Sequence, residues 1–78
     1  MLNMAQKTKL KILREEVKYT QEDFAVSAGL RAKTYRNAER GLNTSYTTAQ
    51  AILRTHNMLR SNRQLKLLTL EDLELHIV

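Results

Sequence analysis

Residues 20–41 read TQEDFAVSAGLRAKTYRNAERG, and this stretch decides how the chain folds. It holds both glycines of the chain, Gly29 and Gly41, and the chain has no proline. Most other residues here favour a helix, whereas glycine commonly ends one, because it has no Cβ to clash in the left-handed conformation. The stretch therefore predicts two short helices, the second over residues 32–40, with a tight turn at Gly29.

The first of these helices has a defined start and an apolar face. Thr20 with Asp23 approximates a capping box, in which the hydroxyl accepts a hydrogen bond from a backbone N–H of the first turn and the acid favours the helix dipole. Phe24, Ala25 and Ala28 follow at helical spacing and are expected to face the core.

The second helix has two different faces. Leu30 in the turn, and Tyr35 and Ala38 on the helix, are predicted to point inward. Two short helices joined by a turn of three to four residues that contains glycine form a helix-turn-helix, so this motif is predicted here. The stripe left outward consists of Lys33, Arg36, Asn37 and Arg40.

Helical periodicity continues on both sides of the motif. Before it, a helix is predicted over residues 4–18, with Asn3 as a candidate cap. After it, Thr47 with Gln50 and Ser61 with Gln64 form two capping boxes, which predict two further helices. The expected buried residues are Leu10, Leu13 and Val17 in the first helix, Ala49, Ile52, Leu53, His56 and Leu59 in the next, and Leu65 and Leu68 in the last.

The final residues allow two interpretations. Thr69 with Asp72 would cap a last helix that buries Leu70, Leu73 and Ile77, whereas the alternation of Leu73, Leu75 and Ile77 with polar residues is typical of a strand. The helix is slightly favoured, and a strand remains the alternative. The sequence thus predicts an all-α, compact bundle of about five short helices, with a helix-turn-helix domain over residues 1–68 and a leucine-rich tail over residues 69–78.

Composition excludes several kinds of protein. A chain of 78 residues forms one domain at most. It has no cysteine, which excludes disulfides, thiolate metal sites and cysteine nucleophiles and fits a reducing cytoplasm. No apolar run reaches the length of a membrane span, and no signal peptide is recognised, so a cytoplasmic protein is expected.

Catalytic residues are not expected either. The chain has no Ser/His/Asp set at recognisable spacing, and His56 and His76 are isolated from each other and from candidate metal ligands. The adjacent acids at 15–16 and 71–72 do not face one another on a helix. We therefore expect no enzyme activity, no metal and no cofactor.

The charge is concentrated in one part of the chain. The net charge is +5, but residues 31–66 hold eight Lys or Arg residues and one acid, Glu39, whereas residues 67–78 hold three acids and no Arg, with the last Lys at position 66. A compact domain with one basic region is typical of a protein that binds a polyanion. The basic region includes the outward stripe of the motif.

Residues 10–41, LKILREEVKYTQEDFAVSAGLRAKTYRNAERG, resemble the lambda-repressor-like helix-turn-helix proteins of the Cro and xenobiotic-response-element type. The family has leucine and arginine in its first helix, a Thr-Gln-acid-acid-apolar-Ala start to the second, Ala-Gly-apolar in the turn, and Glu-x-Gly after the third. Here these are Leu13-Arg14, Thr20-Gln21-Glu22-Asp23-Phe24-Ala25, Ala28-Gly29-Leu30 and Glu39-Arg40-Gly41.

The resemblance implies a role for each matching residue. Gln21 corresponds to the residue that reaches a DNA phosphate and supports the recognition helix, while Arg14 and Glu39 correspond to a structural ion pair. The base-facing positions are Ala32, Lys33, Arg36 and Asn37. Further candidates for phosphate contact are Arg31, Arg40, Asn43 and Thr44, with Ser45 beside them.

Some positions depart from the family pattern. Arg31 stands where the family has Ser or Thr, and arginine cannot cap a helix N-terminus because it has no acceptor. Tyr35 and Ala38 replace the usual aliphatic pair. Ala32 cannot hydrogen-bond a base, although its methyl group can touch the methyl of thymine.

The resemblance implies a sequence-specific regulator of transcription, a repressor, that binds duplex DNA as a homodimer in a prokaryotic cell or phage, associated with the nucleoid. Each third helix would enter a major groove, with half-sites roughly 34 Å apart. The leucine-rich tail is a candidate dimerisation element. The alternative is an antitoxin or adaptor whose tail, residues 69–78, binds a different protein.

Overall fold

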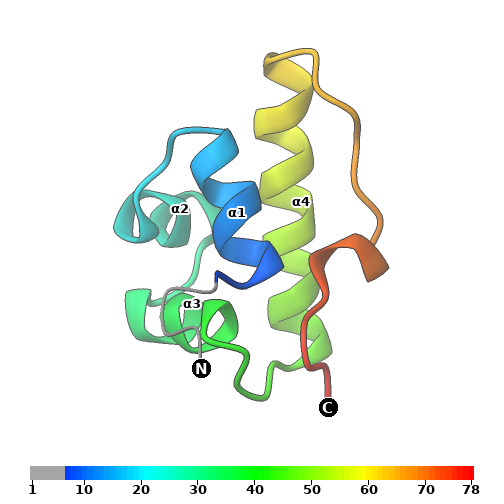
Figure 1. The fold of residues 1–78 in the computed structure, drawn as a ribbon. Coiled ribbons are helices and arrows are strands. Elements are labelled where there is room, and N and C mark those ends of the chain that lie inside the picture. Colours follow the sequence, from blue (N-terminus) through cyan, green and yellow to red (C-terminus); the bar gives the residue numbers. More distant parts are fainter. Residues whose placement is uncertain (1–6) are drawn as a thin grey trace, which may run out of the picture.

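The computed structural model describes residues 7–78 as four α-helices followed by an irregular tail (Figure 1). The helices are α1 (Lys9–Glu16), α2 (Gln21–Ala28), α3 (Ala32–Glu39) and α4 (Tyr46–Asn62), and the tail contains one 3₁₀ turn, η1 (Glu71–Leu73). The long α4 runs the length of the molecule, and α1, α2 and α3 lie on one side of it. The all-α fold is confirmed, with four helices instead of about five.

The first helix starts later than predicted. Asn3 and the first part of the predicted helix lie outside the described residues, but Lys7 and Thr8 are not helical, so α1 begins at Lys9. The Thr8 hydroxyl accepts from the N–H of Lys11 at 3.3 Å and donates to the carbonyl of Glu39 at 2.7 Å. The second of these bonds joins distant parts of the chain, which local periodicity does not reveal.

The helix-turn-helix is formed as predicted. The N–H of Asp23 donates to the Thr20 hydroxyl at 3.0 Å, which caps α2. Gly29 ends α2 in the left-handed conformation, at φ 70°, and the next N–H, that of Leu30, returns to the carbonyl of Ala25 at 2.8 Å. Gly41 adopts φ 87° just after α3, which ends one residue earlier than predicted.

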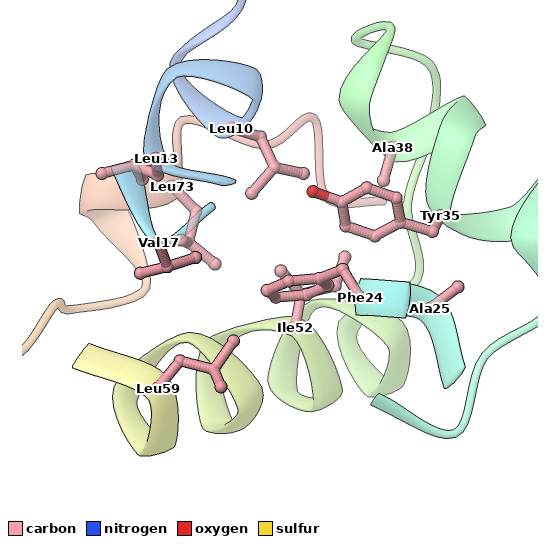
Figure 2. Close-up of a cluster of buried hydrophobic side chains, with 10 residues drawn as sticks. All are labelled: Leu10, Leu13, Val17, Phe24, Ala25, Tyr35, Ala38, Ile52, Leu59 and Leu73. Carbon is pink, nitrogen blue, oxygen red and sulfur yellow. The ribbon is translucent and has the colours of Figure 1, made fainter. Parts of the chain in front are cut away.

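One hydrophobic core joins all of these elements (Figure 2). The rings of Phe24 and Tyr35 lie with centroids 4.9 Å apart, which packs α2 directly against α3. Tyr35 and Ala38 are buried as predicted, whereas Ala28 and Leu30 are partly buried at its edge. The buried cluster consists of Leu10, Leu13, Val17, Phe24, Ala25, Tyr35, Ala38, Ile52, Leu59 and Leu73.

After the motif there is one long helix, not the two that were predicted. Its cap is Ser45, whose hydroxyl accepts from the N–H of Thr48 at 3.1 Å, so the proposed cap at Thr47 was wrong. The helix then runs past Ser61, where a new start was predicted, to Asn62. The chain turns at Gln64, with φ 58°, and returns along α4 without forming a helix (Figure 1).

Side chains of α4 explain why the returning segment is not helical. The carboxamide of Asn57 accepts from the N–H of Leu68 at 2.8 Å and donates to its carbonyl at 3.0 Å. Nε of Arg60 donates to the carbonyl of Lys66. These bonds satisfy backbone groups that a helix would otherwise pair, while Leu65 and Leu68 still pack against the core.

The tail has features of both the helix and the strand that the sequence allowed. The N–H of Thr69 donates to the Asp72 carboxylate at 2.8 Å, as in a helix start, but the turn ends after Leu73 because Glu74 adopts φ 51°. The chain then extends, and a single bridge pairs Ile77 with Thr44. Leu73 is fully buried, whereas Ile77, which a helix would have buried, is 36% exposed.

Candidate nucleic-acid interface

The outer face of α3 carries the residues that were predicted to face DNA bases. Tyr35, Ala38 and Glu39 are buried on the inner side of this helix. Lys33 is exposed on the other side, and Ala32, Arg36 and Asn37 are partly exposed. The structure therefore brings these four residues to one accessible surface made of a methyl group, two cations and an amide.

Arginines stand at both ends of this helix. Arg31 precedes it in an extended conformation and makes no side-chain cap hydrogen bond, as its lack of an acceptor requires. Arg31 and Arg40 are both exposed. The two guanidinium groups thus lie near the ends of the outer face, where cations can approach the phosphates on either side of a groove.

One contact on this face has no signal in the sequence. A carboxylate oxygen of Glu22, on α2, lies 3.7 Å from Nη1 of Arg36. Both side chains are partly exposed, and such pairs contribute little to stability. The contact draws the guanidinium towards α2 in the free protein. Because the two residues are far apart in the sequence, only the packing of α2 on α3 reveals it.

Two candidates for phosphate contact lie in the loop after α3, and only one of them is accessible. Asn43 is exposed and lines a small polar hollow of about 110 Å³ together with Asn37 of α3. Thr44 is only 4% exposed, and its hydroxyl donates to the carbonyl of Leu42 at 3.2 Å. Its backbone N–H and carbonyl pair with His76 and Val78. Thr44 therefore holds the tail in place and presents no free group to a phosphate.

Residues of two helices complete this hollow. They belong to α3 and to the start of α4, where Ser45 caps the helix. Ser45 was a candidate for phosphate contact, but the cap of this helix was predicted at Thr47, two residues later, and Thr34 and Thr48 were not predicted to take part. The full lining is Thr34, Asn37, Asn43, Thr44, Ser45 and Thr48.

Arg14 and Glu39 form a bidentate ion pair on the inner side of α3. Nε of Arg14 donates to Oε2 of Glu39 at 2.8 Å, and Nη2 donates to Oε1 at 3.0 Å. Burial works to raise the pKa of Glu39, but the hydrogen bond from Arg14, with smaller contributions from Tyr35, Gln21 and the charge of Arg14, outweighs it, so that the pKa lies below its usual range. The carboxylate is therefore charged at neutral pH, and it joins α1 to α3.

Gln21, the residue expected to reach a phosphate, belongs to the same network. Its Nε2 donates to Oε1 of Glu39 at 2.9 Å. The side chain is partly buried at the first position of α2, next to the Thr20 cap. The structure thus connects a surface residue of the motif directly to a buried carboxylate.

Two basic residues of α4 lie away from this surface. Arg60 is buried, and its Nη1 donates to the carboxylate of Glu16. His56 was expected in or near the core, and it is fully buried against Phe24, with ring centroids 4.4 Å apart. These residues support the scaffold and are not available to a ligand.

Two further kinds of structure are absent from the described residues. From residue 7 onward, no helix has both the length and the apolar character that a membrane span requires. In the same part of the chain, no group of three or more His, Cys, Asp or Glu residues is placed to hold a metal ion.

Comparison with protein families places the chain in a known class. The helix-turn-helix family model matches residues 10–58, which is more than half of the chain and includes α1 except for its first residue, all of α2 and α3, and most of α4. Neither the curated proteins nor the solved structures give a match. The match and the geometry agree, and the chain belongs to the lambda-repressor and Cro-like family of DNA-binding helix-turn-helix proteins.

Proposed function

We propose that this protein is a sequence-specific transcriptional repressor that binds duplex DNA as a homodimer, with α3 of each copy in a major groove. The observation that carries the proposal is the division of α3 into a locked inner face and an accessible outer face of cations and an amide. Such a protein would act at the DNA of a prokaryotic cell or phage, in the cytoplasm. Binding would repress wherever the occupied site excludes other proteins from the DNA.

Base reading is assigned to three side chains. Arg36 can donate two hydrogen bonds to O6 and N7 of guanine, and Asn37 can pair with N6 and N7 of adenine. Lys33 favours guanine, and the nearby methyl group of Ala32 suits thymine. Each good contact is worth about 1–3 kcal/mol of discrimination between bases. In the complex, Arg36 would exchange its partly exposed partner Glu22 for a base edge.

Phosphate contacts would fix the helix in the groove. Arg31 and Arg40 flank α3, Asn43 lies in the loop after it, and Gln21 begins α2; each has groups that can donate to phosphate oxygens. Thr44 is left out of this set because it is buried and its polar groups are paired. These contacts supply affinity and orientation without reading the sequence.

We assign the homodimer interface to the end of the tail. Ile77, which forms the bridge to Thr44, and Val78 after it are exposed apolar residues. The acidic charge of residues 71–74 differs in sign from the α3 surface, so the tail is unsuited to contact DNA. A second copy is therefore the partner that we assign to Ile77 and Val78.

The repressor proposal is tested by selection from a pool of random duplexes. Bound DNA is enriched, sequenced and measured by fluorescence anisotropy with the wild type, with Arg36→Ala and with the control Lys66→Ala. Lys66 is exposed on the segment that returns along the side of α4 opposite α3 (Figure 1). We expect a palindromic consensus, relaxed at one position of each half-site by Arg36→Ala alone. Failure to enrich any sequence would contradict sequence-specific recognition.

A second candidate function rests on a hollow in the tail. Leu70, Glu71, Glu74, Leu75 and Ile77 line a depression of about 200 Å³ with apolar and acidic groups. This surface would suit a basic, apolar segment of a different protein, as in an antitoxin or adaptor. A monomer in solution that shows no DNA preference would favour this candidate over the repressor.

A further inference from the structure

The buried ion pair of Arg14 and Glu39 is connected to the protein surface by hydrogen bonding. Oε1 of Glu39 accepts two hydrogen bonds, from Nη2 of Arg14 at 3.0 Å and from Nε2 of Gln21 at 2.9 Å. The Glu39 side chain is almost completely buried, whereas Gln21 is only partly buried. Gln21 is therefore the point at which this network reaches solvent.

The carboxylate itself is held firmly from several directions. Oε2 of Glu39 also bonds Nε of Arg14, and Nη1 of the same guanidinium donates to the carbonyl of Tyr19 at 2.7 Å, just before the cap of α2. The backbone carbonyl of Glu39 accepts from the Thr8 hydroxyl. With both ends of the residue bonded, the carboxylate cannot turn away from Gln21 without breaking the pair with Arg14.

Gln21 keeps a donor free while it is anchored. A carboxamide nitrogen carries two hydrogens, and Glu39 takes one of them. Within residues 7–78, the second hydrogen has no partner. A free glutamine loses much rotamer freedom when a ligand orders it, whereas an anchored one has already lost that freedom on folding.

We propose that Glu39 is a positioning residue for DNA binding, which holds the carboxamide of Gln21 so that its second N–H is directed at a phosphate. The inference rests on the proposed function, in which Gln21 contacts the DNA backbone. It gives the carboxylate a task beyond joining α1 to α3. Arg14 takes part indirectly, because it fixes the carboxylate.

The first test uses the free wild-type protein and needs no DNA. Side-chain amide hydrogen exchange of Gln21 and Gln64 is measured by NMR, with Gln21→Ala and Gln64→Ala to assign the signals. Gln64 is exposed at the far end of α4 and serves as the internal reference. We expect one Gln21 hydrogen to exchange about fivefold more slowly than those of Gln64, as one net hydrogen bond allows. Equal rates would overturn the proposal.

The second test is a double-mutant cycle on DNA affinity. Gln21→Ala is expected to weaken binding about tenfold, the loss of one hydrogen bond to a charged group. Glu39→Asp retains the charge but withdraws the carboxylate, and should weaken binding about threefold in the wild type and not at all in Gln21→Ala. An equal loss in both backgrounds would mean that Glu39 only stabilises the fold. Gln64→Ala should leave the affinity unchanged.

The two tests separate this inference from the proposed function. If Glu39→Asp does not fold, which circular dichroism shows, the exchange comparison in the wild type still decides whether Gln21 is anchored. If selection finds no preferred sequence, the repressor proposal fails, and the cycle is repeated on a duplex of arbitrary sequence at low salt. A phosphate contact does not depend on sequence, so the expected coupling is the same.

Discussion

Among single residues, His56 is the most unusual member of the core. Its ring is fully buried, and neither ring nitrogen has a hydrogen-bond partner among the described residues. Burial lowers the pKa of His56 to about 4, and the nearby charge of Arg60 acts in the same direction. The imidazole therefore remains neutral in the folded protein, at the cost of two unsatisfied polar atoms.

This burial predicts a loss of stability in mild acid. Since the unfolded histidine titrates near pH 6.5 and the folded one near 4, the unfolded state binds more protons between these values. The free energy of unfolding should fall by about 2 kcal/mol between pH 7 and pH 5. Urea titrations should show this fall in the wild type and not in His56→Leu, which is apolar and of similar size.

The control for this experiment is His76→Gln, which removes the imidazole of the exposed tail. It should leave the fall between pH 7 and pH 5 in place. Measurements stay above pH 5 because Glu39, whose lowered pKa stabilises the fold only while the carboxylate is charged, loses its contribution at lower pH. The same slope in His56→Leu as in the wild type would contradict the assignment.

At the level of elements, the turn at Gly29 sets how α3 stands against α2. Its backbone is left-handed at φ 70°, and a Cβ built on it would have no atom within 4 Å. Any cost of a side chain here is therefore due to backbone strain and not to a clash. Substitutions at this position therefore measure the contribution of the backbone conformation alone to the free energy of unfolding.

Gly29→Ala should lower the free energy of unfolding by about 1–2 kcal/mol, the usual cost of the left-handed conformation for an ordinary residue. Gly29→Asn should cost less, because asparagine tolerates this conformation. Thermal or urea unfolding measures both. Equal stability of Gly29→Ala and the wild type would show that the turn relaxes into another conformation.

The turn also shows why this motif was predictable and later elements were not. Its cap at Thr20 and its stop at Gly29 are local signals, and the structure follows them. The end of α4 depends on Asn57 and Arg60, whose side chains bond the backbone of residues 66–68. The capping box at Ser61 does not start a new helix, because these tertiary bonds determine the backbone conformation instead.

The candidate site was predictable to a similar extent. Periodicity separated the outer residues of α3 from Tyr35 and Ala38, because that separation depends on one helix alone. The bond between Gln21 and Glu39, the approach of Glu22 to Arg36, and the burial of Thr44 each depend on two elements meeting. The spacing of residues along the sequence does not reveal which side chains of different elements meet.

For the whole molecule, charge separation determines how it would approach DNA. The outer face of α3 carries two cations, with an arginine at each end of the helix, whereas residues 71–74 of the tail are acidic. Such a distribution steers one face of the protein towards a polyanion. Each arginine that neutralises a phosphate also releases a counterion, which makes affinity depend on salt.

Arg40→Gln should weaken binding to selected and unselected duplexes by the same factor. It should also reduce the slope of log K against log salt by about 1 for each subunit, as the loss of one phosphate contact requires. Anisotropy titrations at four salt concentrations give both quantities. Lys66→Gln removes an equally exposed cation from the returning segment and should leave the slope unchanged. Loss of binding to one sequence only would contradict a phosphate role.

The proposed dimer makes a prediction on the same scale. Deleting residues 69–78 would remove Leu73 from the core and confuse unfolding with dissociation, so substitutions at the surface are preferable. Ile77→Ser with Val78→Ser should convert the dimer to a monomer in sedimentation or light-scattering experiments. Val26→Ser is the matched control, since Val26 on α2 is 79% exposed and Val78 is 73% exposed. A monomeric wild type would contradict the dimer.

The bridge between the tail and the loop after α3 has a practical consequence for handling the protein. Val78 donates its N–H to the carbonyl of Thr44, and Thr8 bonds the carbonyl of Glu39, so both ends of the described chain emerge beside the end of α3 (Figure 1). A purification tag or fluorescent fusion attached after Val78 would then lie next to the proposed DNA surface. A polyhistidine tag there could attract nucleic acid or block it, and binding assays should use protein from which the tag has been cleaved.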